Sequence, residues 1–210
     1  MDKTETKQGG DRGLLIVISG PSGTGKGTVC NILRERCPNL RFSISETTRS
    51  PRPHETHGVD YFFVSKAAFE ARIGEHKYLE HATVYENYYG TPKEYVENLR
   101  DQGYDVILEI DIQGADKVRA NCGEGIFIFI APPSLTELRR RIELRGTESP
   151  EQLELRMASA RDEMLRAADY DYMVVNEVKE TAAAQVEAIL TAEHIKTERS
   201  KKRLDTILGR

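Results

Sequence analysis

The chain has 210 residues, and at about 150 residues per domain this length predicts one sizeable core with an insertion. Thirty Lys and Arg against thirty-four Asp and Glu give a formal charge of −4, which argues against a general surface for nucleic acid polymers. Because the net charge is negative, any anion-binding site must be local. With 39% hydrophobic and 30% charged residues, disorder of the whole chain is excluded.

The first segment, residues 1–12, is polar and charged and has no apolar stretch of the kind found in secretory signals. We expect a disordered tail here. The longest apolar runs fall far short of the roughly 20 residues that cross a bilayer, so we expect a cytoplasmic protein without membrane contact. Cys30, Cys37 and Cys122 are odd in number and lack C-x-x-C spacing, which predicts free thiols.

Four apolar runs predict strands that are buried on both faces of a parallel sheet, and they occupy residues 14–18, 106–110, 126–130 and, more weakly, 173–175. Helical spacing separates them, which is typical of an α/β fold with crossover connections. Residues 41–89 interrupt this alternation with short polar-aromatic stretches and a small helix near 66–76. This segment is predicted to be an inserted subdomain.

Capping chemistry predicts where several helices begin. Thr91, Ser134 and Ser149 each offer an N-cap oxygen, with a carboxylate or amide three residues later, and Pro follows Thr91 and Ser149 at the first helical position. Helices from 134 to 145 and from about 150 to 168 form a charged hairpin. A last helix, roughly 181–200, is expected to pack across the sheet, and residues 201–210 form a C-terminal tail.

A glycine-rich loop follows the first predicted strand and precedes a helix. Its residues are Gly20, Pro21, Ser22, Gly23, Thr24, Gly25, Lys26, Gly27 and Thr28. The run nearly satisfies G-x-x-x-x-G-K-[ST], in which backbone N–H groups and the helix N-terminus surround a phosphate and the lysine adds a point charge. The loop predicts binding of nucleotide phosphates, with Lys26 as a catalytic group. A GTPase, an ATPase motor and a small-molecule kinase all stay open at this point.

Gly27 stands where the strict motif has a hydroxyl that binds Mg²⁺. Either Mg²⁺ is held mainly by phosphates and waters, or another side chain contributes. Thr28 and Glu109 are the candidates, and Glu109 lies at the carboxyl end of a predicted central strand, where α/β folds gather catalytic groups. The chain has no N-K-x-D motif for reading guanine as Ras-like GTPases do, so the phosphate acceptor must be sought elsewhere.

The inserted segment offers a second phosphate site. Arg49 and Arg52 lie three residues apart beside several hydroxyls, and Tyr61 follows shortly after them. Two guanidinium groups and a phenol can bind a phosphate monoester through charge-assisted hydrogen bonds.

At this point the sequence closely resembles the guanylate kinases. The matching motifs occur in order between about residues 13 and 195: GPSGTGKGT (20–28), SETTRSPR (45–52), DYFFVS (60–65), YLEHA (78–82), NYYGTP (87–92), ILEIDIQGA (107–115), IFIAPPS (128–134), RRIELRGTES (140–149) and VVNE (174–177). The resemblance implies an α/β, three-layer P-loop nucleoside-monophosphate kinase fold. That fold has a central parallel sheet, an inserted GMP-binding subdomain and a helical lid.

The resemblance also assigns roles to residues of this chain. The residues implied to hold the phosphate of GMP are Arg49, Arg52, Tyr61 and Tyr89. Those implied to bind the guanine base are Ser45, Glu80, Thr91 and Asp111, with Gly90 beside them. The lid arginines implied to close over ATP are Arg141, Arg145 and Arg156, and Asn176 falls in the loop near adenine.

Base chemistry supports the acceptor assignment independently. Guanine presents N1–H and N2–H₂ donors that suit the Glu80 carboxylate, whereas adenine would leave that carboxylate unpaired. The expected reaction is Mg²⁺-dependent transfer from ATP to GMP, and to dGMP. Two alternatives stay open: a guanylate-kinase-like scaffold domain that does no chemistry, and a P-loop kinase for another acceptor such as AMP or a phosphorylated sugar.

The expected domain layout follows. Residues 13–200 form the kinase-like domain, with the core at 13–43, 97–135 and 163–200. The GMP-binding insertion is expected at 44–96 and the lid at 136–162. The sequence is compatible with a monomer and with a homodimer.

Overall fold

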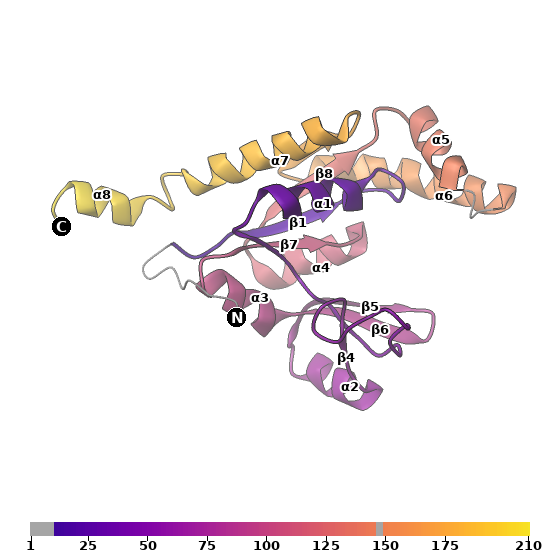
Figure 1. The fold of residues 1–210 in the computed structure, drawn as a ribbon, viewed down its shortest axis with the longest axis horizontal. Helices are drawn as coiled ribbons and strands as arrows, with labels where there is room; N and C mark the ends of the chain where they lie inside the picture. The colour runs from indigo at the N-terminus through magenta and orange to yellow at the C-terminus, as the bar shows by residue number, and fades with distance from the viewer. Residues whose placement is uncertain (1–10, 146–148) are drawn as a thin grey trace.

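The structure is a computed structural model that describes residues 11–145 and 149–210, without the side chains of Arg145, Lys202 and Arg203. Most of the predicted N-terminal tail, residues 1–10, lies outside the described residues. The rest of the chain forms an α/β core with two appendages, and Figure 1 shows both appendages at the same end of the central sheet.

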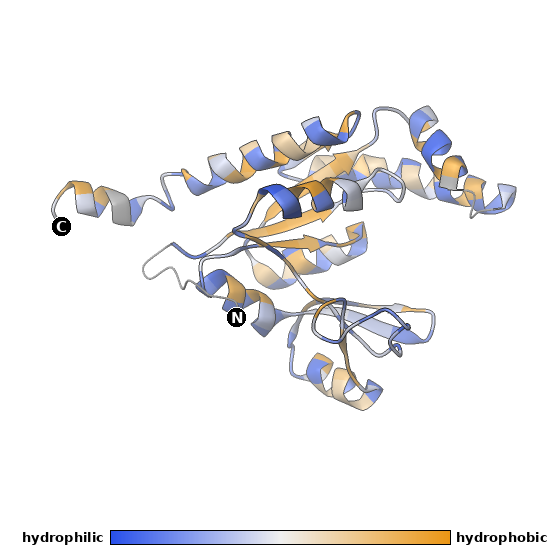
Figure 2. Cartoon of the chain, viewed as in Figure 1, coloured by the Kyte–Doolittle hydropathy of each residue, from blue (hydrophilic) through white to orange (hydrophobic). Residues whose placement is uncertain are grey.

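The core sheet has five parallel strands in the order β2-β7-β1-β8-β9. These are β1 (Leu15–Ser19), β2 (Leu40–Phe42), β7 (Asp105–Glu109), β8 (Ile126–Ala131) and β9 (Tyr172–Val175). All four predicted strands are confirmed, and Figure 2 shows their apolar composition as the most hydrophobic part of the fold. The edge strand β2 was not predicted, because it is three residues long and its central residue, Arg41, breaks the apolar run.

Helices cover both faces of this sheet, which confirms the three-layer prediction. Alternate residues of β1 point to opposite faces, so Ile16 and Ile18 pack against α1 (Lys26–Arg36) and α7 (Lys179–His194). Leu15 and Val17 pack on the other face, against α3 (Lys93–Asp101) and α4 (Ile112–Cys122). Figure 1 shows these two helical layers above and below the strands.

The first appendage is a small sheet in the inserted segment. Its strands are β3 (Glu46–Thr47), β4 (Phe62–Phe63), β5 (Tyr78–Val84) and β6 (Asn87–Pro92), in the order β4-β3-β6-β5, and α2 (Lys66–Gly74) packs beside them. The sheet is attached to the core through α4. Lys117 Nζ donates to the His81 carbonyl at 2.6 Å, and Asn121 Nδ2 donates to the Leu79 carbonyl at 3.0 Å.

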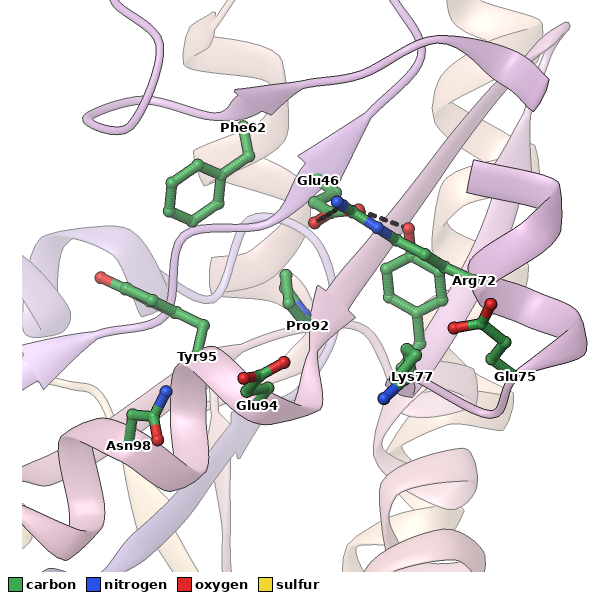
Figure 3. Close-up of a pocket in the computed structure, with 10 residues that line it drawn as sticks. Glu46, Phe62, Arg72, Glu75, Lys77, Pro92, Glu94, Tyr95 and Asn98 are labelled. Carbon is green, nitrogen blue, oxygen red and sulfur yellow. Dashed lines mark hydrogen bonds and ion pairs between the residues drawn. The ribbon is translucent and has the colours of Figure 1, made fainter. Parts of the chain in front are cut away.

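Helix α2 is held to the small sheet by an aromatic stack and a polar cluster. The Phe69 ring stacks on Tyr78, with ring centroids 4.4 Å apart. The buried Glu46 carboxylate accepts hydrogen bonds from Arg72 and from the Tyr78 hydroxyl. Figure 3 shows Arg72 reaching Glu46 beside a hollow of about 360 Å³ that none of the predicted site residues lines.

The prediction that Thr91 caps a helix is wrong. Strand β6 continues to Pro92, Thr91 pairs with Glu80 of β5, and α3 begins only at Lys93. The Thr91 hydroxyl donates to Glu80 Oε1 instead of accepting from a helix N–H. Sheet pairing and a buried carboxylate partner outweigh the local capping pattern.

The second appendage is the predicted charged hairpin of α5 (Leu135–Arg145) and α6 (Pro150–Leu165), followed by a 3₁₀ turn, Arg166–Asp169, instead of α-helix to 168. Ser149 forms the predicted capping box with Gln152, and the Glu137 N–H donates to Ser134 Oγ. Leu138, Ile142 and Ala160 give the hairpin a small core of its own.

The C-terminal helix is shorter than predicted. Helix α7 ends at His194 instead of continuing to residue 200, and residues 201–210, predicted as a tail, contain α8 (Lys201–Ile207). Val186 and Leu190 are buried against the sheet, whereas Ile195 is 65% exposed. The helix stops where it no longer has a sheet to cover, because packing supplies most of the stability of such a helix.

Candidate active site

The glycine-rich loop joins β1 to α1 at the carboxyl edge of the core sheet. Gly20 has φ of 140°, and a Cβ there would lie 2.3 Å from the Ile130 carbonyl oxygen, so β8 leaves no space for a side chain. Gly25 has φ of 87° and is the N-cap of α1. The loop therefore presents its backbone N–H groups and the helix N-terminus to a hollow of about 390 Å³, which suits a chain of phosphates.

Lys26 folds back over the loop. Its ammonium group donates to the carbonyl oxygens of Gly20 at 2.5 Å and Pro21 at 3.1 Å. Burial lowers the pKa of Lys26, and the nearby carboxylate of Glu109 opposes that change. A partly desolvated cation in this position has more to gain from a phosphate than one exposed to water.

Glu109 lines the same hollow as the loop and lies next to the unusual Gly27. A Cβ on Gly27 would be 3.4 Å from Glu109 Oε1, so the carboxylate adjoins the place from which the strict motif extends its hydroxyl. Thr28 also lines the hollow and is exposed. Burial, with Glu109 nearby as charge and hydrogen-bond partner, raises the pKa of the Cys30 thiol. Cys30, Cys37 and Cys122 are free, as predicted.

Asn176 and two arginines of the helical hairpin, Arg141 of α5 and Arg156 of α6, contact the loop. Asn176 is 4% exposed, and its Nδ2 donates to the Thr24 carbonyl at 2.8 Å. Arg141 Nη2 donates to the Asn176 carbonyl at 3.0 Å while its Nε donates to Glu137. Arg156 Nη1 donates to Ser22 Oγ at 3.2 Å. The Arg145 side chain lies outside the described residues.

The side chains predicted for the acceptor phosphate gather on the small sheet. Arg49 Nε donates to the Tyr89 hydroxyl at 3.3 Å, and the Arg49 guanidinium lies 5.5 Å from the centroid of the Tyr61 ring. The rings of Tyr61 and Tyr89 are in edge-to-face contact at 6.0 Å. Arg52 is exposed three residues along the same loop, where its backbone N–H donates to Glu55. Sequence reasoning missed Glu55, because its partners depend on how the loop folds.

The residues predicted for the base include a buried polar pair. Glu80 is 8% exposed and accepts from the Thr91 hydroxyl at 2.7 Å. Asp111 caps α4 by accepting from the Gly114 N–H at 2.7 Å, and it lies near enough to act on the charge of Glu80. Ser45 directly precedes β3, and Gly90 is buried in β6, where a Cβ would lie 2.9 Å from the Tyr78 ring.

The charge of Glu80 opposes folding, and this can be measured. Burial raises its pKa, since the Thr91 bond only partly offsets desolvation. Protonated Glu80 favours the folded state. This contribution to the free energy of unfolding is complete below the ordinary pKa of 4.5, and it is lost as the pH rises through the raised pKa of the folded protein. Glutamine has nearly the shape of a protonated glutamate and carries no charge. We therefore expect Glu80→Gln to raise the Tm at pH 7, by about 2–4 °C for each kcal/mol by which the free energy of unfolding increases.

Calorimetry at several pH values checks this expectation. The gain in Tm of Glu80→Gln should shrink toward zero below pH 4.5, and the exposed Glu35→Gln should show no such trend. A lower Tm for Glu80→Gln at neutral pH would contradict the argument.

Fold and site together define a class. A phosphate loop after the first strand of a parallel sheet, a helical hairpin with arginines above it and a separate arginine-tyrosine cluster on an inserted sheet are the parts of a P-loop kinase for a phosphorylated small molecule. A family model described as guanylate kinase matches residues 12–193.

Individual relatives agree with that match. The chain is 53% identical over 194 residues to a guanylate kinase of Clostridium perfringens strain 13, covering 92% of this chain and 90% of the relative. It is 52% identical over 189 residues to one of Halalkalibacterium halodurans, covering 90% and 93%. The crystal structure of guanylate kinase from Anaplasma phagocytophilum superposes with a TM-score of 0.71 at 36% identity, covering 93% of this chain and 95% of that one. The chain belongs to the guanylate kinase family.

Proposed function

We propose that the chain transfers the γ-phosphoryl group of ATP to GMP, and to dGMP, giving ADP and GDP or dGDP. The observation that carries this proposal is the combination of an intact phosphate loop bearing Lys26 with a buried Glu80–Thr91 pair on the small sheet. The phosphate loop suits the donor nucleotide, and the Glu80–Thr91 pair suits the guanine of the acceptor. The reaction serves purine nucleotide metabolism and the recycling of GMP.

Catalysis here consists of positioning and charge neutralisation. The nucleophile is a phosphate oxygen of GMP, which is largely ionised at neutral pH because the second pKa of a phosphate monoester is about 6. The reaction therefore needs no general base. Arg49, Arg52, Tyr61 and Tyr89 hold the acceptor phosphate, and Lys26 with the lid arginines Arg141, Arg145 and Arg156 neutralises charge on the ATP phosphates.

The pair of Glu80 and Thr91 selects guanine. The Thr91 hydroxyl donates a hydrogen bond to Glu80 Oε1, and the carboxylate keeps acceptor capacity for the N1–H and N2–H₂ groups of guanine. With adenine, this carboxylate would stay buried without a donor from the base, and such a loss can cost several orders of magnitude in kcat/KM. Ser45 and Asp111 complete the base site in this proposal.

Mg²⁺ fits the donor set beside the phosphate loop. Among the described residues no cluster of three or more His, Cys, Asp or Glu side chains could hold a metal, so the nucleotide phosphates would provide most of its ligands. Glu109, with Thr28 as a further candidate, supplies oxygen from the protein next to Gly27. Bound Mg²⁺ supplies charge neutralisation on the phosphates.

Glu109→Gln should weaken the contribution of Mg²⁺ to nucleotide binding. We expect the Mg²⁺-dependent gain in ADP affinity, measured by titration calorimetry with Mg²⁺ and with EDTA, to fall several-fold in this variant. Glu35→Gln, on the exposed side of α1, is the control and should keep the full gain. An unchanged gain in Glu109→Gln would remove Glu109 from the metal site.

Two appendages, the small sheet and the helical hairpin, extend from the core, and we assign a function to each. We assign residues 44–96 to the acceptor, 136–162 to the lid, and 13–43, 97–135 and 163–200 to the core. The three free cysteines suit a reducing cytoplasm. Among the described helices, none combines the length and the apolar character needed to span a membrane.

The test is an assay of ADP release with GMP, dGMP, AMP, CMP and UMP as acceptors. We expect turnover with GMP and dGMP and at least 100-fold lower kcat/KM with AMP. Turnover of AMP without turnover of GMP would overturn the base assignment. No turnover with any acceptor would favour a binding domain without catalysis.

A further inference from the structure

Glu55 lies inside the predicted acceptor-phosphate site, although none of the motifs points to it. Its Oε1 accepts from Arg49 Nη2 at 2.8 Å, and its Oε2 accepts from the backbone N–H of Arg52 at 2.8 Å. One carboxylate therefore joins the two arginines, through the side chain of the first and the backbone of the second. The side chains of Glu55 and Arg49 are 16% and 17% exposed, so this ion pair is better shielded than an ordinary surface pair.

The hydrogen bonds of Arg49 show what the carboxylate does. Within the described part of the chain, the guanidinium donates from Nε to Tyr89, from Nη1 to the Ser50 carbonyl and from Nη2 to Glu55. Three of its five N–H groups are thus engaged, and two are left for a ligand. Because Tyr89 accepts from Arg49, its own O–H proton is left for another acceptor.

A planar guanidinium held on several sides can present its remaining N–H groups in one direction only. An arginine without these partners would sample many rotamers and would have to lose that freedom when phosphate binds. The hydrogen bond that Arg49 donates to Glu55, together with that of the Arg52 N–H, lowers the pKa of the Glu55 carboxyl, so Glu55 stays charged at neutral pH. Charged partners give shorter and stronger hydrogen bonds.

We propose that Glu55 is a positioning residue that orients Arg49 and fixes the Arg52 backbone for the phosphate of the acceptor nucleotide. This proposal rests on the proposed function, because the phosphate is that of GMP. The same contacts define a competing arrangement, in which the carboxylate occupies the place of the phosphate and is displaced when GMP binds. The two arrangements predict opposite signs for the removal of Glu55.

The test measures kcat, the KM values for GMP and ATP, and the Ki of guanosine as a competitor of GMP, in wild type, Glu55→Ala and Glu55→Gln. Guanosine has the base but no phosphate, so it reports on the base site alone. We expect Glu55→Ala to raise the KM for GMP about tenfold, the scale of one hydrogen bond to a charged group. The KM for ATP, the Ki of guanosine and the Tm should stay near wild type.

Glu55→Gln is the informative second variant. Its amide oxygen can still accept from Arg49, while its NH₂ group cannot accept from the Arg52 N–H. We therefore expect a KM for GMP between those of wild type and Glu55→Ala. Glu86→Ala, an exposed carboxylate in the turn between β5 and β6, serves as the control and should match wild type.

If the wild type phosphorylates GMP, the proposed function stands, and three outcomes would then overturn the proposal for Glu55 alone. A lower KM for GMP in Glu55→Ala would identify the carboxylate as a displaced competitor of the phosphate. An unchanged KM would show that Arg49 is oriented without it. A fall in Tm with equal losses for GMP, ATP and guanosine would reveal a purely structural role. A wild type inactive with GMP would overturn both proposals.

Discussion

Replacing Lys26 with alanine should lower kcat by about 10²–10³-fold, which is the loss seen when one group that stabilises transition-state charge is removed. The ammonium group is partly desolvated and already bonded to the Gly20 and Pro21 carbonyls across the loop. In the proposed reaction it moves to the ATP phosphates, where charge passes to the leaving ADP. Single-turnover and steady-state kinetics with saturating GMP measure the loss.

The matched control for Lys26→Ala is Lys179→Ala, at the exposed start of α7. Both variants should keep the wild-type Tm within a few degrees, because the contacts of Lys26 are two hydrogen bonds to carbonyl groups within the loop. Near-wild-type kcat in Lys26→Ala would show that the loop binds nucleotide without taking part in catalysis.

Arg49→Ala should reduce kcat/KM for GMP by at least 100-fold while the affinity for ATP stays within about twofold of wild type. The guanidinium belongs to the small sheet, on which the Tyr61 and Tyr89 rings adjoin it. In the proposed site, Arg49 contributes a positive charge and two N–H groups to the acceptor phosphate, and the substitution removes both. The donor site on the core sheet keeps all of its own groups.

Arg36→Ala is the control for Arg49→Ala, since it removes a half-exposed guanidinium at the end of α1. It should leave both substrates unaffected. Equal losses for ATP and GMP in Arg49→Ala would indicate a general disturbance of the fold, and wild-type kinetics would take Arg49 out of the acceptor site.

The parts of the fold that were predictable are those in which local pattern and tertiary environment agree. The run 126–130 is apolar throughout and becomes β8, buried on both faces of the sheet. The phosphate loop was predictable because its glycines are required by backbone geometry, as the contact between Gly20 and Ile130 illustrates. Ser149 formed its predicted cap because the partners of its hydroxyl, the Gln152 N–H and the Glu151 carboxylate, both lie within the next three residues.

Prediction failed where a distant partner overrode a local signal. Thr91 has the sequence context of a helix N-cap. In the structure it pairs with β5 instead, and its hydroxyl donates to the buried carboxylate of Glu80. Glu55 has no motif of its own, because its role comes from a folded loop that brings it to Arg49. In each case the deciding contact is non-local.

Cys30 lies close to the phosphate loop and is protected from oxidation by its surroundings. Its thiol is buried on the first turns of α1, and its pKa is raised, so the reactive thiolate is scarcely formed at neutral pH. Electrophiles and peroxides attack thiolates, and they will find little here to modify. Burial and protonation together therefore make Cys30 a poor target for oxidants, although it lies on the helix that follows the phosphate loop.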